Sequence, residues 1–160
     1  MKTCVFAGTF DPITKGHEYV INKCLEMFDE IIVAVGVNVD KKPVFTVEQR
    51  VEMITLAFKG NERVKVKTFS GMLVDFMKEN GVKINVRGIR DVDDYKYETT
   101  MSRYNQDGYS DIITVYLPTP TSLEYVSSSG VRNLLSLNAD YSAYVSKAVK
   151  EYADKVLKKI

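Results

Sequence analysis

The chain has 160 residues with a net charge of +1, and 45% of them are hydrophobic and 27% charged. This size and composition are ordinary for one soluble globular domain, so we expect residues 1–160 to form a single domain. The near-zero net charge gives no general electrostatic attraction for nucleic acid, and we expect no nucleic-acid partner. No segment approaches the ~20 apolar residues that span a bilayer, so we expect no membrane partner. Cys4 and Cys24 fall on expected core faces, as reduced thiols of a cytoplasmic protein do.

The first elements alternate between strand and helix. An apolar run over residues 4–7 predicts a buried strand, and it stops at Gly8. Apolar side chains at helical spacing predict a helix over about 15–28. A second continuous apolar run, over 31–35, is typical of a central parallel strand that is covered on both faces. These three elements form a βαβ unit.

The rest of the chain repeats this alternation. Thr46 opens a helix with a capping-box pattern, and three serines at 127–129 cap another. We expect further strands over 64–68, 82–86 and 112–117, and further helices over 72–80, 93–104, 131–135 and about 141–158. The alternation predicts an α/β fold: a doubly wound, Rossmann-like, five-stranded parallel sheet with helices on both faces.

Polar and cationic side chains follow each expected strand. They are Thr9 and His17 after the first, Lys41 after the second, residues 70–73 after the third, Arg87 and Arg90 after the fourth, and Ser127–Ser129 after the fifth. In such folds ligands bind beyond the carboxyl ends of the strands, so the groups are expected at one rim. Cations, hydroxyls and helix N-termini suit an anionic ligand, and nucleotidyl or phosphoryl transfer fits them. We expect Asp11 to fix its own loop through an Asx-type turn.

Five motifs carry a resemblance to a known family. GTFDPITKGH at residues 8–17 resembles the signature of the nucleotidyltransferase superfamily. Four further stretches are similar to the phosphopantetheine adenylyltransferases, in order and in spacing. They are KKPVF at 41–45, RGIR at 87–90, DYKYE at 94–98 with Asn105 after it, and VSSSGVR at 126–132. The resemblance covers about residues 3–135.

The resemblance implies a reaction in coenzyme A biosynthesis. ATP and 4′-phosphopantetheine would give dephospho-coenzyme A and pyrophosphate by direct in-line attack, with Mg²⁺ and without a covalent enzyme intermediate. It also implies a homohexamer and coenzyme A as a feedback ligand, but it does not identify the Mg²⁺ ligands. Two alternatives remain open: another small-molecule nucleotidyltransferase of the superfamily, or a non-catalytic nucleotide sensor.

The resemblance also assigns roles to residues of this chain. The catalytic residues would be His17, Lys41 and Arg90. The ATP-binding residues would be Thr9, Phe10, His17, Gly88, Ile89, Arg90, Glu98, Leu123, Glu124, Tyr125, Val126, Ser127, Ser128 and Ser129. The residues that bind the phosphopantetheine substrate would be Thr9, Lys41, Leu73, Arg87 and Asn105.

Overall fold

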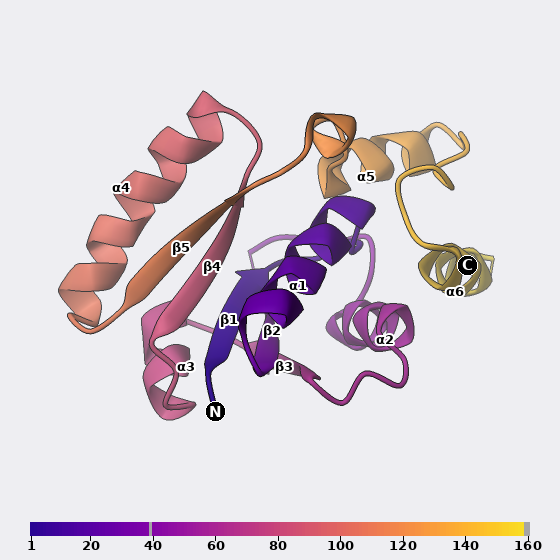
Figure 1. The fold of residues 1–160 in the computed structure, drawn as a ribbon. Coiled ribbons are helices and arrows are strands. Elements are labelled where there is room, and N and C mark those ends of the chain that lie inside the picture. Colours follow the sequence, from indigo (N-terminus) through magenta and orange to yellow (C-terminus); the bar gives the residue numbers. More distant parts are fainter. Residues whose placement is uncertain (39, 159–160) are drawn as a thin grey trace.

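Five parallel strands form one sheet in the computed structural model, which describes residues 1–38 and 40–158 (Figure 1). The strands are β1 (Thr3–Gly8), β2 (Glu30–Gly36), β3 (Val64–Phe69), β4 (Ile84–Ile89) and β5 (Ile113–Pro118). Their order across the sheet is β3-β2-β1-β4-β5, and every neighbouring pair is parallel. The expected Rossmann-like sheet is therefore confirmed, with the first strand at its centre.

Helices cover both faces of this sheet. They are α1 (Lys15–Met27), α2 (Val47–Ala57), α3 (Leu73–Glu79), α4 (Val92–Gly108), the short 3₁₀ helix η1 (Thr121–Leu123), α5 (Ser128–Ser136) and α6 (Lys147–Leu157). Because side chains alternate along a strand, Cys4 and Phe6 of β1 pack with α1, α2, α5 and α6. Val5 and Ala7 face the other way, toward α3, and α4 lies beside α3. This two-sided burial explains why the first two strands are continuous apolar runs.

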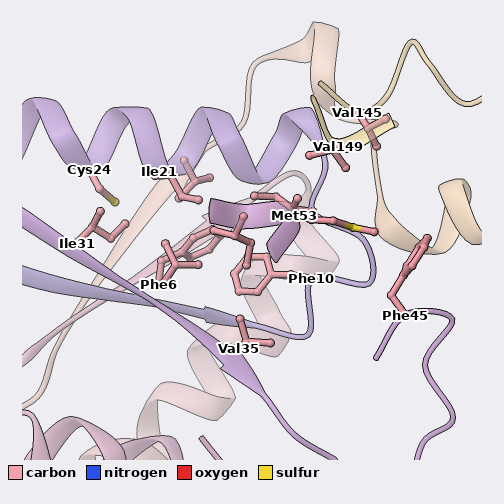
Figure 2. Packing of buried hydrophobic residues seen from close by; sticks show 14 of the residues in the cluster. Phe6, Phe10, Ile21, Cys24, Ile31, Val35, Phe45, Met53, Val145 and Val149 are labelled. Carbon is pink, nitrogen blue, oxygen red and sulfur yellow. The ribbon is translucent and has the colours of Figure 1, made fainter. Parts of the chain in front are cut away.

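The larger core cluster joins the amino-terminal strand to the carboxyl-terminal helix. Figure 2 shows Phe6 and Phe10 below Ile21 of α1. Met53 of α2 belongs to the same fully buried cluster as Val149 of α6, and these two helices pack together. The amino-terminal loop that holds Phe10 is therefore built into the core.

Several expected boundaries differ from the structure: α5 begins at Ser128 rather than residue 131, and α4 ends at Gly108 rather than residue 104. The last helix begins at Lys147 rather than near residue 141. Tyr141 and Val145 are buried at a spacing that resembles a helix, but they lie in an irregular segment before it. The Tyr141 hydroxyl donates a hydrogen bond to the α6 carboxylate of Asp154 (2.7 Å), which anchors the segment without helical backbone.

Strand β4 is also shifted along the chain, because it begins at Ile84 rather than at residue 82. It extends to Ile89, because Arg87, Gly88 and Ile89 continue the pairing with β5. Arg87 therefore belongs to the strand and does not follow it. Among the described helices, none has the length and apolar character needed to cross a membrane.

Candidate active site

A pocket of about 440 Å³ opens at the carboxyl ends of the strands. Its walls come from the segment after β1, the first turn of α1, the loop before α2, the end of β4, helix α4 and the first turn of α5. The sequence-predicted residues that line it are Thr9, Phe10, His17, Lys41, Arg87, Gly88, Arg90, Glu98, Val126, Ser127, Ser128 and Ser129. The sheet order explains this convergence, since β1 and β4 are adjacent and their following segments diverge to opposite faces.

His17 is the only histidine of the chain, and it stands in the first turn of α1. Its Nδ1 accepts a hydrogen bond from the backbone N–H of Thr14 (3.0 Å). A backbone N–H can only donate, so the proton of the neutral imidazole lies on Nε2. Burial, and then the positive charges of Arg87 and Arg90, lower the pKa of His17 from 6.5 to about 4. At neutral pH this ring is therefore an uncharged N–H donor in the wall of the pocket.

The ring of Phe10 packs against the ring of His17. Its ring is 2% exposed and meets the His17 ring edge-on, with the centroids 4.9 Å apart. The backbone of Phe10 has a φ of 51°, in the left-handed region that few non-glycine residues adopt. A Cβ on Gly8 would come within 3.2 Å of the Phe10 ring, so glycine leaves the space that this ring needs. Phe10 thus lines the pocket but is mainly a packing residue.

The loop between β1 and α1 is held by partners distant in sequence. Asp11 does not close a local turn as expected: its carboxylate accepts hydrogen bonds from the backbone N–H groups of Val44 and Phe45, both 2.9 Å. The carbonyl of Thr9 accepts from Arg50 (2.7 Å). These contacts connect the Thr9–His17 segment to the loop that carries Lys41. Lys41 itself is exposed and lines the pocket.

The two arginines near the end of β4 are paired with acids of α4. Arg87 forms a two-pronged contact with Glu98 (Nε–Oε2 3.0 Å, Nη2–Oε1 2.8 Å) and donates from Nη1 to the carbonyl of Ala7 (2.6 Å). Arg90 contacts Asp94 at 3.2 Å. The expected substrate residue Arg87 and the expected ATP residue Glu98 thus engage each other. These contacts hold the Arg87 guanidinium in the wall of the pocket, near enough to His17 for its charge to lower the pKa of the imidazole.

Helix α5 supplies a second helix N-terminus. The Ser127 hydroxyl caps it by accepting from the N–H of Gly130 (3.0 Å), and Ser128 donates to the carbonyl of Pro12 (2.7 Å). Free N–H groups and a partial positive charge at such an end favour anions. Arg132 also lines the pocket, donating to the carbonyl of Asp11 and to Ser129. It was missed as a site residue, although it closes the VSSSGVR motif one helical turn after the serines.

The remaining sequence-predicted residues do not line this pocket. They are Ile89, Leu73, Asn105, Leu123, Glu124 and Tyr125. Leu73 starts α3 and packs partly on the smaller core cluster, while Asn105 is half-buried in the last third of α4. Leu123 and Glu124 belong to the turn before α5, and Tyr125 is 69% exposed and stacks edge-on with Tyr144. The structure therefore does not bring these six residues into the pocket with the others.

The carboxylates of the pocket are poor candidates for a metal site. Asp11 accepts from two backbone amides, and Asp94 and Glu98 are paired with arginines. Within residues 1–38 and 40–158, no three His, Cys, Asp or Glu side chains gather as a metal-binding group. The donor set instead fits phosphate oxygens. Lysine, arginine, a neutral imidazole N–H and two helix N-termini can together hold several phosphates and stabilise added negative charge.

Comparisons with known proteins agree with this geometry. The family model described as cytidylyltransferase-like matches residues 5–134. A phosphopantetheine adenylyltransferase of Heliobacterium modesticaldum is 41% identical, over 98% of this chain and 96% of its own length. Proteins of the same name from Clostridium botulinum (44% identical, over 84% of this chain and 82% of its own) and Clostridium perfringens (36%, over 94% and 92%) are also similar. With the family match spanning most of the chain and the relatives aligned over 82–96% of their own lengths, the chain belongs to the cytidylyltransferase-like family and, within it, to the phosphopantetheine adenylyltransferases.

Proposed function

We infer that this protein is an enzyme that transfers the adenylyl group of ATP to 4′-phosphopantetheine, which gives dephospho-coenzyme A and pyrophosphate. The relatives' shared name and the family match support this reaction. The structural observation that carries it is the neutral His17 N–H donor, set among Lys41, Arg87 and Arg90 in one pocket. Such a site stabilises developing negative charge without supplying a nucleophile.

The proposed mechanism is a direct displacement at phosphorus. An oxygen of the acceptor phosphate attacks the α-phosphorus of ATP, a new P–O bond forms, and the bond to the bridging oxygen of pyrophosphate breaks. A phosphate monoester is largely dianionic above its second pKa near ~6, so the attacking oxygen needs no general base. His17, with its proton on Nε2, would donate to an α-phosphate oxygen as charge builds there.

Other residues would position the two substrates. We propose that Lys41 and Arg87 hold the acceptor phosphate, and that Arg90 and the N-terminus of α5 at Ser127–Ser129 hold the β- and γ-phosphates. We propose that Thr9, which directly follows β1 at the centre of the sheet and lines the pocket, contacts both ATP and the acceptor phosphate. Arg87 would keep one N–H on each of its terminal nitrogens for the ligand while its other donors stay with Glu98 and Ala7.

The outer parts of the two ligands would contact the margins of the pocket. We propose that the segment Leu123–Val126 and Gly88–Ile89 border the adenosine, with Phe10 contributing through its backbone. Leu73 and Asn105 would border the pantetheine arm. When bound with ATP, Mg²⁺ would supply neutralisation of the phosphate charge. No residue of this chain is assigned to that ion, because the pocket's acids are already engaged.

We further propose that residues 1–160 form one domain and that the protein works in the cytoplasm as a homohexamer. We also propose coenzyme A as a feedback ligand, because it resembles the product. Buried free thiols at Cys4 and Cys24 suit a reducing compartment. The proposed hexamer is supported by helix α4. None of its 17 residues is buried, and Tyr97 and Tyr104 are 64% and 62% exposed, so this surface is available for contacts between subunits. Light scattering after size exclusion tests the hexamer, and a monomer would contradict it.

Pyrophosphate release tests the reaction. The protein is assayed with ATP and 4′-phosphopantetheine beside CTP with glycerol phosphate and ATP with nicotinamide mononucleotide. We expect turnover with the first pair only. Turnover with another pair would favour a different nucleotidyltransferase, and ATP binding without turnover of any pair would favour a nucleotide sensor.

A further inference from the structure

Two oppositely charged side chains, Asp11 in the wall of the pocket and Arg50 of α2, are buried and are not explained by binding of phosphates. Asp11 is 3% exposed and Arg50 is 2% exposed, and neither carries a role in the proposed displacement. Charges are rarely buried so deeply unless other polar groups compensate them. All the hydrogen bonds of these two side chains are to backbone groups near the ends of β1 and β2 and in the loop before α2, which indicates what the burial is for.

Arg50 connects three segments. From α2 it donates through Nη1 to the carbonyls of Thr9 (2.7 Å) and Gly36 (3.1 Å), and through Nε to the carbonyl of Phe45 (3.2 Å). These acceptors stand after β1, at the end of β2 and just before α2. Burial lowers the pKa of the Arg50 guanidinium, and the negative charge of Asp11 opposes that effect.

Asp11 also binds the backbone of the loop before α2. Its two carboxylate oxygens each accept one backbone N–H, from Val44 and from Phe45. The N–H of Phe45 is therefore bound by Asp11 and its carbonyl by Arg50, while its ring is fully buried (Figure 2). Lys41 lies four residues before this doubly anchored point.

We propose that Asp11 and Arg50 are positioning residues that set Lys41 at a fixed distance from Thr9 and His17. The inference rests on the proposed function, because it takes the acceptor phosphate as the ligand of Lys41. Asp11 acts only on the Lys41 loop through its side chain, whereas Arg50 also holds the carbonyl of Thr9. The two side chains therefore have different kinetic signatures.

Asp11→Asn is the first test. The two N–H groups bind different carboxylate oxygens, and in the amide one of these positions becomes an NH₂ donor that faces an N–H. We expect the KM for the acceptor to rise on the order of tenfold, with the KM for ATP changed less than about twofold. Asp40→Asn is the matched control: it removes the same charge from an exposed position of the same loop, and we expect both KM values to stay within about twofold of the wild type.

A double-mutant cycle separates positioning from general destabilisation. If Asp11 acts through Lys41, then Asp11→Asn combined with Lys41→Ala raises the acceptor KM no further than Lys41→Ala alone. Amide hydrogen exchange at Val44 and Phe45 should also accelerate in Asp11→Asn. Equal rises in both KM values, or independent effects of the two substitutions, would overturn the inference.

If Asp11→Asn does not fold, Arg50→Lys is used to test the same inference. A lysine keeps the charge but cannot reach three carbonyls in the fork geometry of a guanidinium. We expect both KM values to rise, because Thr9 also loses its partner, and the acceptor effect again to vanish in the Lys41→Ala background. A wild-type protein without pyrophosphate release would overturn the proposed function. An active wild type with additive cycles would overturn only the positioning role.

Discussion

The protonation state of His17 gives a sharp test, because the chain has one histidine and its ring signals need no assignment. With the pKa lowered to about 4, the ring stays neutral through the range in which an ordinary histidine titrates. At pH 6 only about 1% of the ring would be protonated, against about three-quarters for an unperturbed histidine. Carbon-detected NMR of the imidazole between pH 3.5 and 8 measures this directly, and nitrogen shifts report whether the proton lies on Nε2.

The same shift makes stability depend on pH. The unfolded chain binds a proton on this histidine below pH 6.5 while the folded chain does not, so stability falls as the pH drops from 6.5 toward 4. The full shift corresponds to at most about 3 kcal/mol, and solvent near the half-buried ring reduces it. Replacing Arg90 with alanine should raise the pKa of His17. A midpoint near 6.5 in the wild-type protein would refute both the assigned charge state and the role of His17 as a neutral donor.

Three substitutions test other parts of the structure. His17→Ala should lower kcat on the order of 10²–10³-fold in the pyrophosphate assay while ATP affinity is kept, and a loss under about fivefold would contradict its role. Gly8→Ala would put a Cβ 3.2 Å from the Phe10 ring that supports His17, so kcat should fall several-fold with little change in either KM. Tyr141→Phe removes the hydrogen bond to Asp154 and should lower the unfolding free energy by about 1 kcal/mol and the Tm by roughly 2–4 °C, with kcat unchanged.

Two variants serve as controls for these substitutions. In Gly36→Ala the nearest atoms to the new Cβ lie 3.6 Å away, an ordinary contact, so the activity should survive. Tyr125→Phe removes a hydroxyl from a residue that is 69% exposed and lies outside α4, so the Tm should not change. Equal effects in control and test variants would show that the named contacts are not responsible.

The sheet could be predicted because its central strands carry an unusually strong signal. A parallel strand covered on both faces must be apolar at every position, and residues 31–35 meet that condition without a break. The start of the last helix could not be predicted, since Tyr141 and Val145 are buried for tertiary reasons at a spacing that a helix would also give. Periodicity reports burial, and it does not distinguish which backbone conformation achieves it.

The candidate site could be predicted where residues are adjacent in sequence, but not where their partners are distant. His17 and the serine cap were found from their local context, and both line the pocket. The partners of Asp11 lie 33 and 34 residues away, and Arg50 reaches Thr9 across 41 residues. One local signal for Arg50 exists: it stands one helical turn before the fully buried Ile54, on the inward face of α2. A charge on an apolar helix face indicates a buried polar role.

The central place of β1 has a consequence for how the chain matures. Its neighbour on one side, β2, follows within about 30 residues, but its other neighbour, β4, is formed by residues 84–89. During synthesis β1 is therefore an edge strand until about half of the protein has been made. Until then the backbone N–H and C=O groups of the apolar residues 4–7 are open to pairing with another strand. The bond from Arg87 to the carbonyl of Ala7, 80 residues apart, forms only when that edge closes. Pairing with β4 thus removes an aggregation-prone edge and, in the same step, fixes Arg87 in the wall of the pocket.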